Sequence, residues 1–173
     1  VISDTLGWPM DLLLCKKVSH PDNPELAIGS VCADGTRMQT SAAATDELDF
    51  NHRAEQLHQW LLARYQVLTG RPSPIDFRNK TVVITDDGMA TGSTMLSAIR
   101  SARHAGAARV ICAVPVSSVE AAHRVRQAAD DFICPNLPEP FDAIGQFYSH
   151  FPEVTDRTVS ELISGKPISL VKP

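Results

Sequence analysis

The chain has 173 residues, which at roughly 150 residues per domain predicts one domain with enough side chains to bury a core. Its 16 basic and 20 acidic residues give a net charge of −4, and 43% of its residues are hydrophobic, as in ordinary globular proteins. This composition argues against disordered, collagen-like and coiled-coil proteins. The lack of a long apolar run and of a basic block argues against a membrane span and general nucleic-acid binding.

The first half of the chain is predicted to hold short strands followed by one long helix. The apolar run over 11–15 predicts a buried strand, and the breaker-rich segment over 18–25 predicts a mobile connection. Strand-like pieces over 26–32 and 36–40 flank an Asp-Gly pair, which favours a tight hairpin. Apolar residues recurring every three or four positions over 51–69 predict an amphipathic helix.

The second half alternates strands and helices. A polar link over 71–80 precedes a predicted strand over 81–85, and a turn then leads into a helix that ends near residue 106. Further strands are predicted over 109–116 and 132–134. Such alternation is typical of right-handed βαβ units, so we expect an α/β fold with a parallel sheet covered on both faces.

A helix is also predicted between the last two strands. Ser117 and Glu120 have the spacing of a capping box, which would begin this helix. Its inward-facing residues are predicted to be Val119, Ala122, Val125 and Ala129.

The cysteines and histidines show no pattern of a metal site. The cysteines are scattered without a CxxC pair, at Cys15, Cys32, Cys112 and Cys134. They predict free structural thiols in a reducing compartment, and with no secretory leader pattern we expect the cytoplasm.

The residues with the clearest chemical signal follow the strand over 81–85. Ligands of open α/β sheets bind at the carboxyl ends of strands, and here the strand leads directly into Asp86 and Asp87. Two adjacent carboxylates repel each other and resist burial, so they contribute little as packing. A ligand with hydroxyl groups, or a divalent cation, would relieve that cost.

The next residues have the properties of a phosphate site. Gly88 and Gly92 permit close approach of the backbone, and Thr91, Ser93 and Thr94 bring hydroxyls to the first turn of a helix. Free N–H groups and the positive end of the helix dipole at such a turn favour a phosphate. An acidic pair beside a phosphate cradle fits a sugar phosphate.

Other interpretations of this string are weaker. Asp87 could cap a turn and Thr91 or Ser93 a helix, but that does not account for the whole string. A P-loop requires a lysine after the last glycine, and a dinucleotide fingerprint requires a GxGxxG spacing; neither is present.

The string from Val82 to Thr94 resembles the 5-phosphoribosyl-1-pyrophosphate (PRPP) motif of the type I phosphoribosyltransferases. The resemblance extends over nearly the whole chain, including the Lys16-Lys17 strand, the segments 23–29 and 139–156 and the long helix. It is closest to a bacterial branch that is sometimes fused to a hydrolase. It implies a three-layer α/β/α fold with a central, mostly parallel sheet, a β-hairpin or flexible loop and a small C-terminal hood.

The resemblance also implies roles for individual residues. Asp86 and Asp87 would be the catalytic pair that holds the ribose hydroxyls, and Lys16 and Lys17 would contact the pyrophosphate. Magnesium would enter with PRPP, without direct ligands from the protein. The remaining residues of the PRPP loop would be Gly88 and Met89, and the 5′-phosphate would be held by Ala90, Thr91, Gly92, Ser93 and Thr94.

The acceptor is less defined. Enzymes for 6-oxopurines carry an aspartate at the position of Ala90, so the resemblance disfavours hypoxanthine and guanine without establishing adenine. Aromatic residues gather in the tail, where relatives place the hood over the acceptor. We favour a small satellite core there over stacking on a base; the residues are Phe141, Phe147, Tyr148 and Phe151.

Together these features predict a phosphoribosyltransferase that binds Mg-PRPP and transfers phosphoribose to a nitrogenous base, releasing pyrophosphate. The alternatives are a non-catalytic PRPP or nucleotide sensor and a ribose-phosphate hydrolase. The expected partners are small molecules, without nucleic acid or membrane, and the resemblance allows a homodimer. Residues 1–173 are expected to form a single domain that lacks the family's first strand and pyrophosphate loop, with 1–6 as the remainder of a helix. Such a chain would bind the phosphoribosyl half better than the pyrophosphate half.

Overall fold

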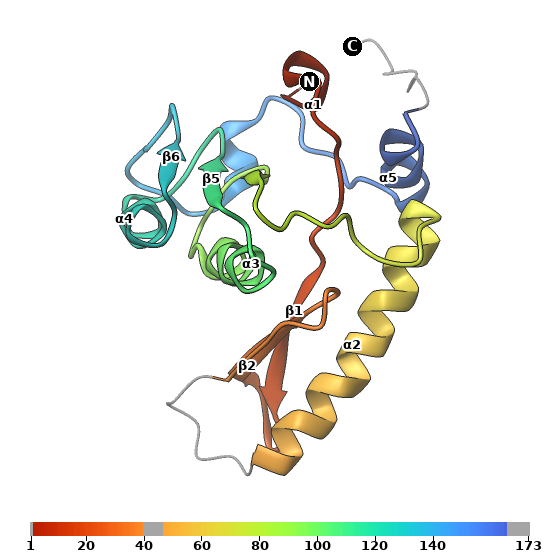
Figure 1. The fold of residues 1–173 in the computed structure, drawn as a ribbon. Coiled ribbons are helices and arrows are strands. Elements are labelled where there is room, and N and C mark those ends of the chain that lie inside the picture. Colours follow the sequence, from red (N-terminus) through yellow and green to blue (C-terminus); the bar gives the residue numbers. More distant parts are fainter. Residues whose placement is uncertain (1, 40–46, 166–173) are drawn as a thin grey trace.

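The computed structural model of the chain describes residues 2–39 and 47–165. Within these ranges the strands form two three-stranded sheets: an antiparallel sheet in the order β1-β2-β3 and a parallel sheet in the order β4-β5-β6 (Figure 1). We call the antiparallel sheet with its covering helix the hairpin half, and the parallel sheet with its helices the parallel half.

The hairpin half comes from the first part of the chain. Its elements, with the short helix that precedes them, are α1 (Ile2–Leu6), β1 (Cys15–His20), β2 (Asn23–Cys32), β3 (Arg37–Gln39) and α2 (Glu47–Thr69). Helix α2 packs along β1 and β2, and its far end reaches α5. The buried residues of this half include Val18, Ile28, Leu61 and Tyr65.

The parallel half follows the link over 71–80. Its elements and the tail are β4 (Thr81–Thr85), α3 (Ser93–His104), β5 (Arg109–Ala113), α4 (Val119–Ala128), β6 (Asp131–Ile133), the one-turn helix η1 (Ile144–Phe147) and α5 (Asp156–Ile163). Helix α3 packs on β4 and β5, and α4 packs on β6. The two helices also contact each other, so they lie on the same face of the sheet. The expected α/β class with a parallel sheet and a hairpin is confirmed.

The segment over 11–14 joins the two cores and is not the strand that its apolar run predicts. It is irregular up to Cys15, where β1 begins. Leu12 and Leu14 pack against the core of the hairpin half, whereas Leu13 packs against the core of the parallel half. Alternate side chains are therefore buried on opposite sides, which explains the apolar run without strand pairing.

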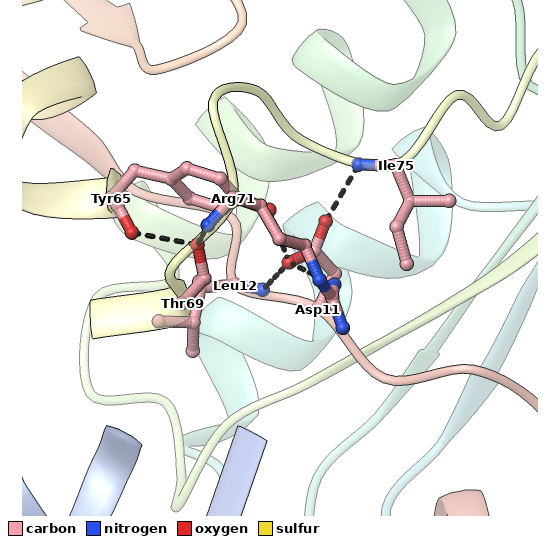
Figure 2. Close-up of polar contacts among 6 residues, drawn as sticks. All are labelled: Asp11, Leu12, Tyr65, Thr69, Arg71 and Ile75. Atoms are coloured by element: carbon pink, nitrogen blue, oxygen red, sulfur yellow. Dashed lines mark hydrogen bonds and ion pairs between the residues drawn. The ribbon is translucent and has the colours of Figure 1, made fainter. Parts of the chain in front are cut away.

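A carboxylate holds this segment in place (Figure 2). One Asp11 carboxylate oxygen accepts hydrogen bonds from the Tyr65 hydroxyl at 2.7 Å and the Leu12 N–H at 2.9 Å, and lies 3.3 Å from an Arg71 nitrogen. The other accepts the Ile75 N–H at 2.7 Å. Burial, followed by the Asp11 hydrogen bond, raises the pKa of Tyr65. Asp11 thus ties the N-terminal segment to the end of α2 and to the link.

The connection predicted over 18–25 is instead largely strand. β1 and β2 pair directly, with only residues 21 and 22 in the turn, because the backbone over 15–20 finds its hydrogen-bond partners in β2. The hairpin predicted at the Asp-Gly pair is confirmed: β2 and β3 pair, and Gly35 lies between them with a φ of +88°. Residue 40, the last of the predicted strand over 36–40, lies outside the described residues.

Several helix and strand boundaries differ from the prediction, including those of β6, which lies one residue earlier than the predicted 132–134. α2 begins at Glu47, before the predicted start, and β5 ends at Ala113. The N-cap of α4 is Ser118, whose hydroxyl accepts the Ala121 N–H at 3.1 Å. Ser117, the predicted cap, is buried, and its hydroxyl donates to the Ser118 carbonyl at 2.9 Å. Val119, predicted to face inward, is exposed, since it lies in the first turn on the solvent side.

The prediction for the cysteines is wrong for one pair. Cys15 and Cys32 are directly opposite on β1 and β2 and form a disulfide. The strand register brings together two residues that are 17 positions apart in sequence, and the spacing alone gave no sign of it. Cys112 and Cys134 are free. Among the described helices, none has the length and apolarity needed to cross a bilayer.

Candidate functional site

The predicted residues of the PRPP loop, together with the acidic pair, lie around one cavity. Asp86 to Met95 form its wall, together with Ile144 from the tail, and its volume is about 200 Å³. The cavity opens where β4 ends, at the carboxyl edge of the parallel sheet, as expected for a ligand site of this architecture. The sequence-predicted residues of the loop are therefore neighbours in space as well as in sequence.

The loop is attached to the segment that leads into α4. The Met89 N–H donates to the Val116 carbonyl at 3.0 Å, and the Met89 carbonyl accepts the Ser118 N–H at 2.9 Å. The Ser118 hydroxyl donates to the Ala90 carbonyl at 2.7 Å. Arg124 of α4 donates from Nη2 to the Thr91 carbonyl.

Two glycines allow this close fit. Gly92 has a φ of +70°, and a Cβ there would lie 3.2 Å from the Ala121 Cβ. At Gly88 a Cβ would lie 2.9 Å from both the Ile144 and the Val116 side chains. Gly92 therefore answers a backbone requirement as well as close packing, whereas Gly88 is required by packing alone.

The first turn of α3 is left available to an anion. Its N-cap is Gly92, which has no side chain to accept a hydrogen bond, and the Ser93 N–H makes only a long hydrogen bond, of 3.4 Å, to the Thr91 hydroxyl. The hydroxyls of Thr91 and Ser93 lie 3.1 Å apart beside this turn. Unsatisfied amides at the positive end of a helix, with hydroxyls next to them, form a site suited to phosphate.

The surroundings of Asp86 disfavour its charged form. The Asp87 N–H donates to Asp86 Oδ1 at 3.0 Å. Desolvation raises the pKa of Asp86, the adjacent Asp87 charge adds to this rise, and the Asp87 N–H opposes it. The charged form of Asp86 is therefore disfavoured in the folded chain, which is the condition that a hydroxylated ligand or a divalent cation would relieve.

The tail contacts the acidic pair through a hydrogen bond. The Tyr148 hydroxyl donates to the Asp87 carbonyl at 2.6 Å. Two ring pairs support this contact, Phe141 with Phe147 and Tyr148 with Phe151, each with centroids 5.0 Å apart. The rings pack in two partly exposed pairs, so the satellite core favoured from the sequence is not a buried one, and the tail also brings Ile144 and Tyr148 to the site.

Lys16 and Lys17 lie elsewhere. Both line a second cavity of about 410 Å³ between β1 and α2, which shares no lining residue with the first. The Lys16 ammonium lies 4.2 Å from the centre of the Trp60 ring, a cation–π contact.

Although both residues border this cavity, their side chains belong to opposite faces of the hairpin, because successive residues of a strand alternate. Lys16 is opposite Val31, which is buried in the core under α2, and Lys17 is opposite Ser30. Directly opposite side chains share a face, and the Ser30 hydroxyl lies 3.4 Å from that of Ser97 on α3. Lys17 therefore shares the face directed toward α3, whose first turn lines the PRPP-loop cavity.

Sequence reasoning missed three residues around the loop, Ser118, Arg124 and Ile144, and named Tyr148 only as one of the aromatic residues in the tail. Ser118 and Arg124 gave no signal, since serines and arginines are common on protein surfaces. Among the described residues, no group of three or more His, Cys, Asp or Glu side chains could hold a metal.

Comparison with known proteins agrees with the geometry. Residues 2–150 match the family described as phosphoribosyl transferase domain. Two Mycobacterium tuberculosis proteins, named "Putative phosphoribosyl transferase" MT0597 (strain CDC 1551 / Oshkosh) and Rv0571c (strain H37Rv), are 32% identical over 167 residues. The match covers 91% of this chain and 37% of each relative, so the chain spans little more than a third of their length.

A solved structure is also similar. TT1426 from Thermus thermophilus superposes with a TM-score of 0.81 at 33% sequence identity, covering 94% of this chain and 78% of that one. The chain belongs to the phosphoribosyl transferase domain family.

Proposed function

We propose that this domain binds Mg-PRPP in the cavity after β4 and transfers its phosphoribosyl group to a nitrogenous base. Family membership indicates a transferase. The observation that carries the finer proposal is the joint presence, around one cavity, of the acidic pair and the uncapped first turn of α3. The hydroxyls and the 5′-phosphate of a ribose phosphate match these two groups.

In this reaction a ring nitrogen of the base forms a bond to the anomeric carbon as the bond to pyrophosphate breaks. Positive charge develops on the sugar, and the carboxylates of Asp86 and Asp87 would favour that charge electrostatically. The amides and hydroxyls over 90–94 would hold the 5′-phosphate and so fix the position of the ribose. Ile144 and Tyr148 would lie near the acceptor.

Magnesium fits this site as a companion of PRPP. Adjacent carboxylates whose charges disfavour each other are suited to a nearby divalent cation, and the raised pKa of Asp86 reflects the electrostatic cost that such a cation would offset. When bound, magnesium would neutralise the pyrophosphate leaving group. A role in nucleotide metabolism, in the cytoplasm, remains part of the proposal, and the Cys15–Cys32 disulfide gives the location no support.

Calorimetric titration with PRPP and magnesium tests the binding step. We expect heat of binding for the wild type and a loss of about 100-fold or more in affinity for the double variant Asp86→Asn/Asp87→Asn, since hydrogen bonds to charged groups contribute about 1.5–3 kcal/mol each. Asp131→Asn, at the amino end of β6 and the opposite edge of the sheet, is the matched control. Absent heat, or equal heats from the wild type and the double variant, would contradict the proposal.

The transfer step is tested by incubating PRPP with a panel of nucleobases and measuring pyrophosphate release. Release that depends on the base supports the transferase and identifies its acceptor. Release without a base would indicate a hydrolase, and binding without release would indicate a sensor.

A further inference from the structure

The hydrogen bonds from Ser118 and Arg124 to the PRPP loop determine the direction of the loop's amides. Three successive carbonyls are bound from that side: Met89 by the Ser118 N–H, Ala90 by the Ser118 hydroxyl and Thr91 by Arg124. In a planar trans peptide the N–H points opposite to the carbonyl of the same unit. The N–H groups of Ala90, Thr91 and Gly92 are therefore directed away from α4.

We infer that Arg124 and Ser118 are positioning residues, which set the three amides over 90–92 toward the cavity in advance of the ligand. The same residues line the cavity, so amides turned from α4 face the space where the phosphate is proposed to bind. Successive amides directed at one point form an anion-binding concavity. The loop is then ordered during folding, so phosphate binding does not lose free energy by ordering it.

Arg124 has the larger role of the two. Its bond to the Thr91 carbonyl is charge-assisted, and such bonds are about twice as strong as neutral ones. The contact to Glu120 is longer, at 3.7 Å, and the Arg124 Nε is buried without a partner among the described residues. A buried donor without a partner is unfavourable, so the guanidinium is placed to serve Thr91 at some cost to its own hydrogen bonding.

The ligand part of this inference rests on the proposed function, but the position of the loop can be measured without ligand. The variants are Arg124→Gln, Arg124→Lys and Ser118→Ala, with Arg126→Gln as the control on the same helix. The Arg126 guanidinium lies 5.0 Å from the centre of the Phe132 ring on β6. Circular dichroism first establishes that each variant is folded.

The first measurement, in the ligand-free protein, is the chemical shifts of the amides over 90–92 and the hydrogen exchange of the hydrogen-bonded Met89 and Ser118 amides that attach the loop. We expect faster exchange and displaced shifts in Arg124→Gln, partial restoration in Arg124→Lys and no change in Arg126→Gln. The second is the affinity for PRPP, ribose 5-phosphate and inorganic phosphate. We expect a loss of about tenfold or more for all three in Arg124→Gln and a smaller loss in Ser118→Ala, as for lost charged and neutral hydrogen bonds.

The outcomes separate the two proposals. If the wild type binds no phosphate compound, the proposed function fails, and the exchange data still decide whether Arg124 orders the loop. If Arg124→Gln is folded, and its loop amides and affinities match those of Arg126→Gln, the inference is wrong. A change in thermal stability alone, with both readouts unchanged, would also contradict it, because it would make Arg124 merely structural.

Discussion

The parallel half and the hairpin half each contain a cavity, and the two cavities are built differently. The cavity in the parallel half is formed almost entirely by one continuous segment, Asp86 to Met95. Within it, the Ala90 and Thr91 carbonyls accept hydrogen bonds from Ser118 and Arg124. The cavity in the hairpin half is larger and is lined by residues of β1 and α2. There the Lys16 ammonium is already engaged by Trp60.

This difference shows why size alone does not identify a site. In the parallel half the N-cap of α3 is a glycine, and desolvation disfavours the charged form of Asp86, so a ligand would satisfy both. In the hairpin half the Lys16 ammonium already makes a cation–π contact with the Trp60 ring. The following predictions test whether binding belongs to the parallel half alone, or whether the hairpin half adds to it.

The largest effect is expected from Gly92→Ala. An alanine at a φ of +70° is strained by about 1–2 kcal/mol, and its Cβ would also press on Ala121. We expect the affinity for PRPP to fall by about 100-fold, with a lowered melting temperature. Gly70→Ala is the control in the hairpin half, since Gly70 has a φ of +68° with nothing within 4 Å. It should lose stability and keep its affinity; equal affinities for the two variants would contradict the assignment.

Lys17→Ala and Lys16→Ala form the next pair. Because Lys17 shares the face directed toward α3, its loss should weaken PRPP about tenfold while leaving ribose 5-phosphate unchanged, as for one charge-assisted contact to pyrophosphate. Lys16→Ala should affect neither ligand, because the Lys16 ammonium is held by Trp60. Calorimetry with both ligands measures this, and a stronger effect at Lys16 would place the pyrophosphate in the hairpin half.

The pH dependence should be smaller and reports on Asp86. Its pKa is raised by desolvation and by Asp87, so the folded protein holds this proton more tightly than the unfolded chain. Its stabilising effect is present below the ordinary aspartate pKa of about 3.9 and is lost as the pH rises through the raised value. Affinity for Mg-PRPP should rise over that same range. Asp86→Asn should flatten the melting-temperature profile, and a profile that keeps its wild-type slope would be inconsistent with this assignment.

The smallest effect is expected from Tyr148→Phe. The variant loses one hydrogen bond to the Asp87 carbonyl, worth about 0.5–1.5 kcal/mol, so PRPP affinity should fall by about threefold. Burial and the charges of Asp87 and Asp86 raise the pKa of Tyr148, so its hydroxyl remains a donor at neutral pH. The control is Phe147→Leu, which disturbs the tail without removing this bond. If both variants behave alike, Tyr148 acts only through packing.

Much of the parallel half could be predicted because its signals are local. The strand over 81–85 was predicted with its observed bounds, and the acidic pair, the glycines and the hydroxyls follow one another directly in the sequence. A turn followed by the start of a helix places such residues close together whatever surrounds them. Ser117 illustrates the limit, because its backbone N–H donates to the distant Asn136 carbonyl and the cap of α4 is Ser118.

The sequence by itself determined the fold class, the long helix and the composition of the PRPP loop, since each depends on periodicity or on neighbouring residues. Only the tertiary structure decided which lysine lies on the face of the hairpin that is directed toward α3, and that Cys15 pairs with Cys32. It also decided that Arg124 and Tyr148 contact the loop. These are pairings between distant residues, fixed by strand register and by packing. A shift of one residue in register reverses the face of every side chain in a strand, and no local pattern encodes that choice.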